Sequence, residues 1–270
     1  MSQRTQKKRS LFFDSIRHIF SVFFKQAKKS RKTKVLFLLS VLPVLMASTI
    51  QFIYLFNARG SFSGIYVFSN MIMTSYLQFL VPILALFYGT SVCSDELEGK
   101  TLTYLTSRPV PKSSIVLGKY AALTLLTIMM TCTGVVLSFL ILNIDRLSDL
   151  SLYKILLRDA VVLSLGLICY AALFTFVGTF LKKSILFGLI FVFGWENVIQ
   201  YFPGSTQRFA IVHYLKSLLP PASRGRFSFL LFRLEPSPTL IAIGMLLLIT
   251  AVFLALAAFL FSYREYIFED

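Results

Sequence analysis

Six apolar stretches, each about as long as a bilayer is thick, constrain what this chain can fold into. A helix needs about 20 apolar residues to cross the hydrocarbon core of a membrane. The stretches run over Val35–Phe56, Met71–Val92, Ile115–Leu142, Asp159–Leu181, Ile185–Phe202 and Leu240–Phe261. Lys182, Lys183 and Ser184 leave room only for a tight hairpin between the fourth and the fifth. We therefore predict an all-α polytopic membrane protein, with a six-helix transmembrane bundle over residues 35–270.

Composition supports a membrane class over a soluble one. Hydrophobic residues make up 56% of the 270 residues and charged residues only 14%, whereas a soluble domain carries about 25% charged residues. The net charge of +15 fits basic residues that flank apolar spans and contact anionic lipid. No basic groove or base-stacking module is readable, so nucleic acid is not an expected partner.

The distribution of Lys and Arg predicts the orientation, because cytoplasmic loops carry an excess of them. The first 34 residues are rich in basic residues, whereas the loop after the first stretch holds only Arg59. The segment Cys93–Tyr120, which joins the second stretch to the start of the third, carries Lys100, Arg108, Lys112 and Lys119. The hairpin between the fourth and fifth stretches carries Lys182 and Lys183. We expect both termini, this linker and this hairpin on the cytoplasmic side of the plasma membrane. Residues 203–239 are then external, since long loops cross largely regardless of charge.

Residues 1–34 form a basic segment with an amphipathic pattern. At helical spacing, Phe12, Phe13, Ile16, Ile19, Phe20, Phe23 and Phe24 share one face, and polar residues gather on or near the other. Asp14, Arg17 and His18 interrupt the apolar run, which is unlike a signal peptide. The pattern predicts a helix lying in the inner interface. It is either an elbow that braces the bundle and frames a docking cleft, or a plain membrane anchor.

The cytoplasmic linker, residues 93–114, concentrates features found in no other interior linker. Asp95, Glu96 and Glu98 precede Gly99, and residues 101–105 follow as a short helix or turn. Pro109 and Pro111 then impose an extended break, because residues before proline avoid helical angles. The linker is thus expected to form a short, rigid, charged element at the inner face. Such an element can transmit a movement, which a flexible loop would absorb.

This linker resembles that of the membrane subunits of type-2 ABC transporters, the exporter-type permeases. The matching residues are Glu96, Glu98, Gly99, Thr101, Leu102, Leu105, Arg108, Pro109, Val110, Lys112, Ile115, Gly118 and Lys119. The resemblance extends to the whole layout: six spans, a basic interfacial helix, a cytoplasmic element between spans two and three, and a long external segment before span six.

The resemblance implies a permease subunit that couples ATP hydrolysis by a separate ATPase to substrate export. Two copies or two homologues would pair, and the ATPase, which binds ATP and Mg, would dock on the linker. The coupling residues it implies are Asp95, Glu96, Glu98, Gly99, Thr101, Leu105, Arg108 and Pro109. The chain has no phosphate loop of the GxxxxGK[ST] type, so it is not expected to be an enzyme or to bind a cofactor itself.

Polar residues inside the spans are the other candidates for function. Gln78 lies in the second stretch, and Glu196, Asn197 and Gln200 lie in the fifth. An ionisable residue within a span is costly and marks a functional site by default. Glu196 either lines the pathway or makes an interface or interhelical contact, and Gln78 fits an interhelical hydrogen bond. Gly166, Gly178, Gly188 and Gly194 are expected at close helix contacts.

Two other function classes stay open. A lipid-active membrane enzyme would need converging carboxylates, His or metal ligands inside the spans, and only Glu196 is available. A membrane scaffold without transport would keep the same topology. The three cysteines form no CxxC pair, so no metal site is expected. In the external segment, Phe209–Leu219 and Phe227–Leu234 fit either interfacial or re-entrant helices or a loosely ordered loop.

Overall fold

The computed structural model describes residues 2–56, 63–98, 112–181, 183–199, 205–220 and 236–263, with the backbone alone for 2–14, 93–98, 112 and 205. These residues form helices joined by short turns, and no strand occurs among them. The long helices are α1 (Ser2–Lys29), α2 (Arg31–Phe56), α4 (Val81–Glu98), α6 (Lys112–Leu142), α7 (Leu150–Phe180) and α10 (Thr239–Tyr263). The shorter elements are α3 (Gly64–Met71), η1 (Ile72–Leu80), η2 (Ile144–Arg146), α8 (Ser184–Ile190), η3 (Phe191–Glu196), η5 (Ser205–Phe209) and α9 (Ile211–Leu218).

Within the described residues, five helices are long and apolar enough to cross a membrane. They run over Arg31–Phe56, Gly64–Val92, Ser113–Leu142, Leu150–Phe180 and Thr239–Tyr263. The all-helical fold and a multi-pass membrane protein are thereby confirmed. The predicted fifth span corresponds to a shorter apolar helix, Ser184–Glu196, and residues 200–204 lie outside the described part. The count of six crossings therefore stays a prediction.

The fourth span begins earlier than the sequence pattern indicated. We expected it to start near Asp159, but α7 starts at Leu150. Arg158 and Asp159 stand at the expected boundary, and their side chains pair with each other. Arg158 Nη2 lies 3.1 Å from Asp159 Oδ1, and Asp159 is buried. Because a paired charge costs less in apolar surroundings than an isolated one, the helix continues through this position.

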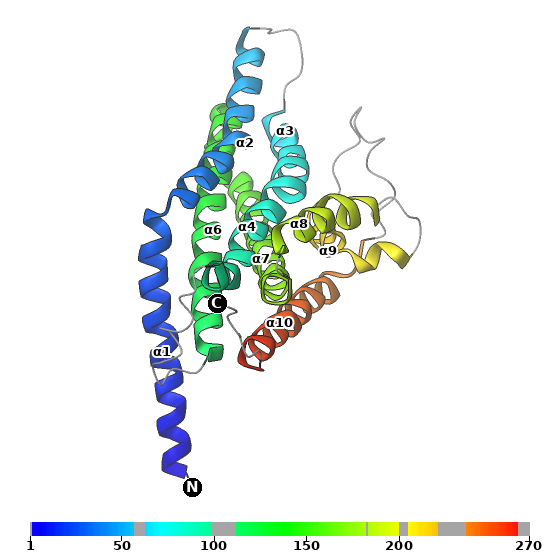
Figure 1. Ribbon diagram of the computed structural model, residues 1–270. Coiled ribbons are helices and arrows are strands. Elements are labelled where there is room, and N and C mark those ends of the chain that lie inside the picture. The colour runs from blue at the N-terminus through cyan, green and yellow to red at the C-terminus, as the bar shows by residue number, and fades with distance from the viewer. Residues whose placement is uncertain are drawn as a thin grey trace.

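Helices α4 and α7 form the centre of the bundle, where they pack along each other (Figure 1). Glycine allows this approach: a Cβ built on Gly178 would lie 2.8 Å from the Thr90 carbonyl oxygen. Gly166 and Gly188 also lie at close contacts, against Leu215 and Leu86 respectively. The prediction for Gly194 is wrong, because its nearest outside atom is 4.0 Å away, on Ile190 of the same helical segment.

Helix α1 packs along α6 and then turns at Ser30 into α2 (Figure 1). Ile19 sits on Gly118 of α6, where a built Cβ would lie 2.7 Å from Ile19 Cγ2. Ile16, Phe20 and Phe23 of α1 are also half-buried. This contact with α6 favours a bracing elbow over a plain anchor. That α1 lies in the membrane interface remains a prediction.

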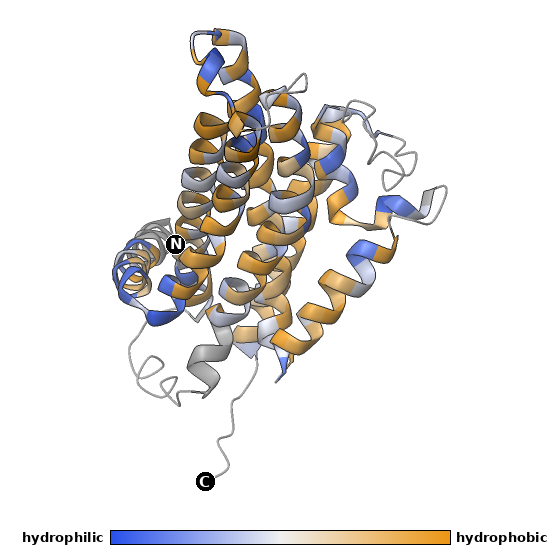
Figure 2. Ribbon diagram, turned by 90° about the horizontal axis from the view of Figure 1, so that it is seen from above, coloured by the Kyte–Doolittle hydropathy of each residue, from blue (hydrophilic) through white to orange (hydrophobic). Residues whose placement is uncertain are grey.

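Most residues of the bundle helices are hydrophobic, as the orange ribbons in Figure 2 show, and many of their apolar side chains are exposed. Only 17% of the most apolar window of α10 is buried, and 28% of that of α2. Exposed apolar side chains in such numbers are stable only against lipid tails or another apolar protein surface. These two helices therefore offer the largest faces for lipid or for a partner subunit.

Candidate functional site

The predicted coupling element falls mostly outside the described residues. Helix α4 continues to Glu98, so Asp95, Glu96 and Glu98 lie on its last turns, where only the backbone is described. Gly99, Thr101, Leu105, Arg108 and Pro109 are outside the described residues. Helix α6 begins at Lys112. The element thus joins two long neighbouring helices at one end of the bundle.

Two of the predicted polar residues meet inside the bundle. Gln78 Nε2 donates a hydrogen bond to Asn197 Oδ1 over 2.6 Å. Asn197 Nδ2 in turn donates to the Val192 carbonyl oxygen at 2.9 Å. The interhelical hydrogen bond expected of Gln78 is therefore confirmed, with Asn197 as its partner. Gln200 lies outside the described residues.

A π-helical segment lies at or next to each side of this contact. Gln78 lies within η1, and Asn197 directly follows η3. Pro82 lies four residues after Gln78; a proline removes one helical hydrogen bond and crowds the carbonyl four residues earlier. A wider turn relieves that crowding, and we attribute η1 to it. Single π-helical turns are found frequently at functional sites.

Glu196 anchors the start of α9. It is 3% exposed. Its Oε1 accepts a hydrogen bond from Ile211 N at 3.1 Å, and its Oε2 accepts one from Val212 N at 3.3 Å. The first amides of a helix have no partner within the helix and favour negative charge. Ala210, the N-cap residue, provides no side-chain hydrogen bond, so Glu196 caps α9 from a distant part of the chain.

Glu196, Asn197 and Gln78 line one small cavity together with Leu77, Pro82, Tyr170, Val192 and Val212. Its volume is about 10 Å³, close to the space of a single water molecule. The cluster therefore ties α9, η3 and η1 together and leaves no room for a substrate. Of the two hypotheses for Glu196, the structure supports the interhelical contact.

Two features of this region escaped the sequence analysis. The Ile211 and Val212 amides carry no side-chain signature that would reveal them as partners of a carboxylate. Lys216, on α9, is half-buried; burial lowers the pKa of its amine to about 8, while the Glu196 carboxylate acts to raise it. A lone Lys within an apolar run such as residues 209–219 is the signal that could have linked it to Glu196.

A serine and histidine network joins α9 to the segment before α10. His213 Nε2 lies 3.0 Å from Ser237 Oγ, and Ser237 N donates to Ser217 Oγ at 3.1 Å. His213 itself is buried. Residues 211–218 thus form a helix that packs on α7 and α10, which confirms the helical alternative for the first half of the segment predicted to be external. Residues 227–234 lie outside the described residues.

A large cleft opens where α1 turns into α2, and we call it the elbow cleft. It has a volume of about 1250 Å³. Its lining comes from residues between Phe23 and Leu42, from Phe87, Tyr88 and Ser91 of α4, from Lys119 and Leu123 of α6, and from Ile185 of α8. The N-terminal elbow, the end of α4 and the starts of α6 and α8 therefore lie at the same end of the bundle. The described residues hold no group of three or more His, Cys, Asp or Glu placed to bind a metal ion.

Comparison with known families decides the class of the protein. The sequence model of the family described as ABC-2 family transporter protein matches residues 25–195. The match runs from the end of α1 to the residue before Glu196 and includes the whole of residues 93–114, the predicted coupling element. The chain belongs to the ABC-2 transporter family.

ABC-2 family chains are membrane subunits of transporters, generally not catalytic, and a separate subunit carries the ATPase. The resemblance read from the linker motif and the layout is thereby confirmed. No curated protein matches this chain at a significant level.

Proposed function

We propose that this ABC-2 chain is the permease of an ATP-driven exporter in the plasma membrane, with both termini cytoplasmic. A separate cytoplasmic ATPase binds ATP and Mg and docks on residues 93–114. The observation that carries the proposal is the family match, which spans this element together with the helices on either side of it.

A second permease copy or a homologue completes the transporter in this proposal. The apolar faces left open on α2 and α10 support it, because each offers a broad surface for association within the membrane. The distribution of basic residues supports the orientation. The elbow, the end of α4 and the starts of α6 and α8, all expected on the cytoplasmic side, share one end of the bundle, as this orientation requires.

The experiment that tests the proposal is ATP hydrolysis by the reconstituted complex. The chain is co-expressed with its genomic neighbour ATPase, as wild type and as the double variant Glu96→Ala/Glu98→Ala. We expect the wild-type complex to co-purify and hydrolyse ATP, and the double variant to lose assembly or substrate-coupled turnover.

The matched control is Asp145→Ala/Asp149→Ala, which removes two exposed acids from the turn between α6 and α7, on the expected external side. It should leave assembly and turnover unchanged. A complex that never forms, or a Glu96/Glu98 variant that behaves as wild type, would contradict the coupling role and favour a scaffold without transport.

A further inference from the structure

The N-terminal elbow and helix α4 face each other across the elbow cleft. Helices α1 and α2 pack chiefly on α6, whereas α4 packs chiefly on α7. The cleft has a volume of about 1250 Å³, and residues of α1, α2 and α4 line it. Side chains therefore leave open space between the elbow and α4, so a bond that crosses this space can tie the movements of the two together.

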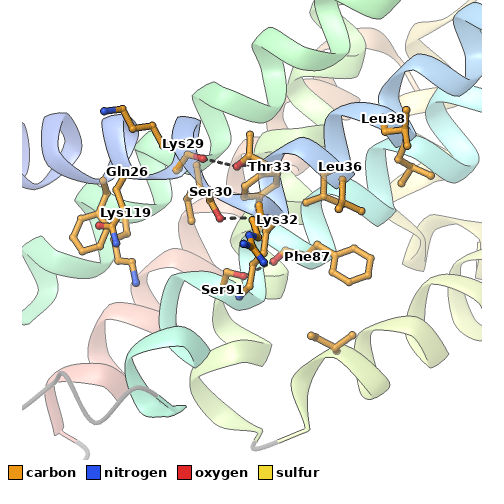
Figure 3. Close-up of a pocket in the computed structure, with 18 of the residues that line it drawn as sticks. Gln26, Lys29, Ser30, Lys32, Thr33, Leu36, Leu38, Phe87, Ser91 and Lys119 are labelled. Atoms are coloured by element: carbon orange, nitrogen blue, oxygen red, sulfur yellow. Dashed lines mark hydrogen bonds between the residues drawn. The ribbon is translucent and has the colours of Figure 1, made fainter.

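Two buried hydroxyl groups make such a bond. Tyr88 Oη of α4 donates a hydrogen bond to Thr33 Oγ1 of α2 over 2.8 Å. Thr33 Oγ1 donates in turn to the Ala27 carbonyl oxygen of α1 over 2.6 Å (Figure 3). Tyr88 is 4% exposed and Thr33 is 6% exposed. The three residues thus form one chain of hydrogen bonds from α4, through the start of α2, to the end of α1.

The directions of these two bonds are compatible with each other. A threonine hydroxyl has one proton to donate and two lone pairs that can accept. Thr33 donates its proton to Ala27 and accepts the proton of Tyr88, so both bonds exist at the same time. Ala27 lies in the last turn of α1, where carbonyl groups lack a partner within the helix. Burial strengthens both bonds, because the dielectric constant inside a protein is low.

Helix α4 leads directly from this bond into the predicted coupling element. Tyr88 lies on α4, and the same helix continues to Glu98, within residues 93–114. Rigid helices and hydrogen-bond networks are the structures that carry energetic coupling between distant sites. A displacement of the end of α4 therefore also displaces Tyr88 and acts on its bond to Thr33.

We propose that the Tyr88–Thr33 bond transmits the movement of the coupling element to the N-terminal elbow. This role rests on the proposed docking of the ATPase on residues 93–114. When ATP binding displaces the end of α4, Tyr88 carries Thr33 with it, and the turn between α1 and α2 follows because Thr33 also holds Ala27. The elbow cleft leaves room for that movement. Tyr88 and Thr33 are positioning residues in this scheme.

The test measures hydrogen exchange in the complex of the chain with its neighbouring ATPase. Exchange is compared with and without ATP, Mg and vanadate, which traps the ATPase in one state. In wild type we expect trapping to change exchange over residues 89–98 and over residues 15–34. Tyr88→Phe removes the hydroxyl and keeps the ring, so the change over residues 89–98 should persist and the change over residues 15–34 should be lost. Thr33→Val should behave in the same way, whereas Thr33→Ser, which keeps a hydroxyl, should respond as wild type does.

The matched control is Tyr76→Phe. Tyr76 Oη lies 2.8 Å from Ser138 Oγ in a buried contact between η1 and α6, and neither residue lines the elbow cleft. This variant loses a bond of the same length and chemistry, so it should keep the response of both segments to trapping. A purely structural role of Tyr88 would destabilise the protein without separating the responses of the two segments.

A change over residues 15–34 that persists in Tyr88→Phe would overturn the proposal. The movement would then reach α1 through α6, where Ile19 lies on Gly118. A wild-type response confined to residues 89–98 would also overturn it, because the elbow would then stay still. The absence of any response over residues 89–98 in an assembled complex would instead contradict the proposed docking of the ATPase, and the role of the Tyr88–Thr33 bond would fall with it.

Discussion

Gln78 and Asn197, 119 positions apart in the sequence, share a hydrogen bond of 2.6 Å that joins the π-helical stretch η1 to the residue directly after η3. Next to it, Glu196 holds the first two amides of α9. The predicted second span, the short apolar helix and the first part of the segment predicted to be external are thus fastened at one point. Motion of any one of them must be transmitted to the others or must break these bonds.

Replacement of Gln78 by Leu should destabilise the protein by about 1 kcal/mol, because side-chain hydrogen bonds between membrane helices contribute amounts of this size. Unfolding by detergent in mixed micelles measures the loss. A double-mutant cycle with Asn197→Leu should show that the two changes are not additive. Thr74→Ala is the control, since Thr74 bonds only to the Asn70 carbonyl within its own helical segment. Additive effects would mean that the two amides do not interact.

Glu196→Leu should cost about 2 kcal/mol, since it leaves the N-terminal amides of α9 without a partner in a buried place. Glu196→Gln keeps one acceptor and should cost less. Hydrogen exchange at Ile211 and Val212 should accelerate in both variants. Asp149→Ala serves as the control: Asp149 is the N-cap of α7 but makes no side-chain capping bond. Unchanged exchange at Ile211 and Val212 in the Leu variant would argue against the cap.

Gly118→Leu should displace α1 from α6, because the new side chain would enter the space of Ile19. We expect faster hydrogen exchange over residues 15–29 and a loss of stability of about 1 to 3 kcal/mol from overpacking. Gly244→Leu, in α10, has nothing within 4 Å of the built Cβ and should be tolerated. If α1 kept its protection in Gly118→Leu, the contact between α1 and α6 would not hold the elbow.

The lowered pKa of the Lys216 amine predicts that the stability of the protein depends on pH. In the folded protein, burial lowers the pKa of its amine to about 8, although the nearby Glu196 charge acts to raise it. In the unfolded chain the amine keeps its ordinary pKa of about 10.4. Between these values the unfolded state binds more protons, so this group makes stability rise with pH. Below about pH 8 its contribution is constant and unfavourable.

The measurement compares the melting temperatures of wild type and Lys216→Met from pH 7 to 9.5. The advantage of the Met variant should shrink as pH rises, because only wild type gains stability from loss of the Lys216 proton. Lys183→Met, an exposed lysine at the hairpin before α8, should show a constant difference from wild type. A constant difference for Lys216→Met as well would mean that its amine is solvated in the folded protein.

The apolar runs predicted the helical class and the approximate positions of five long helices, because length and hydropathy suffice to identify a membrane span. The interhelical hydrogen bond expected of Gln78 is also present. The early start of α7 was missed, since neighbouring Arg158 and Asp159 look like a span boundary until their pairing is known.

The partners of Glu196 could not be predicted at all. Backbone amides have the same chemistry at every residue, so only the folded arrangement shows which ones meet a carboxylate. The elbow cleft was anticipated in kind, as a hollow framed by the N-terminal helix, but not in composition. Its Tyr88, Lys119 and Ile185 come from three helices that are distant in sequence.

The two π-helical stretches are places where the length of the chain can change without rotating the helix. A π-helical turn encloses about one more residue than an α-helical turn, so deleting a single residue within η1 would let ordinary α-helix form there. Because the narrower turn takes up the missing residue, the helix before Ile72 and after Leu80 would keep nearly its present rotation about the axis. The same deletion in α6 or α7, which are α-helical throughout, would rotate every later residue by about 100° around the helix axis. Single-residue deletions should therefore be tolerated better in η1 than in α6 or α7.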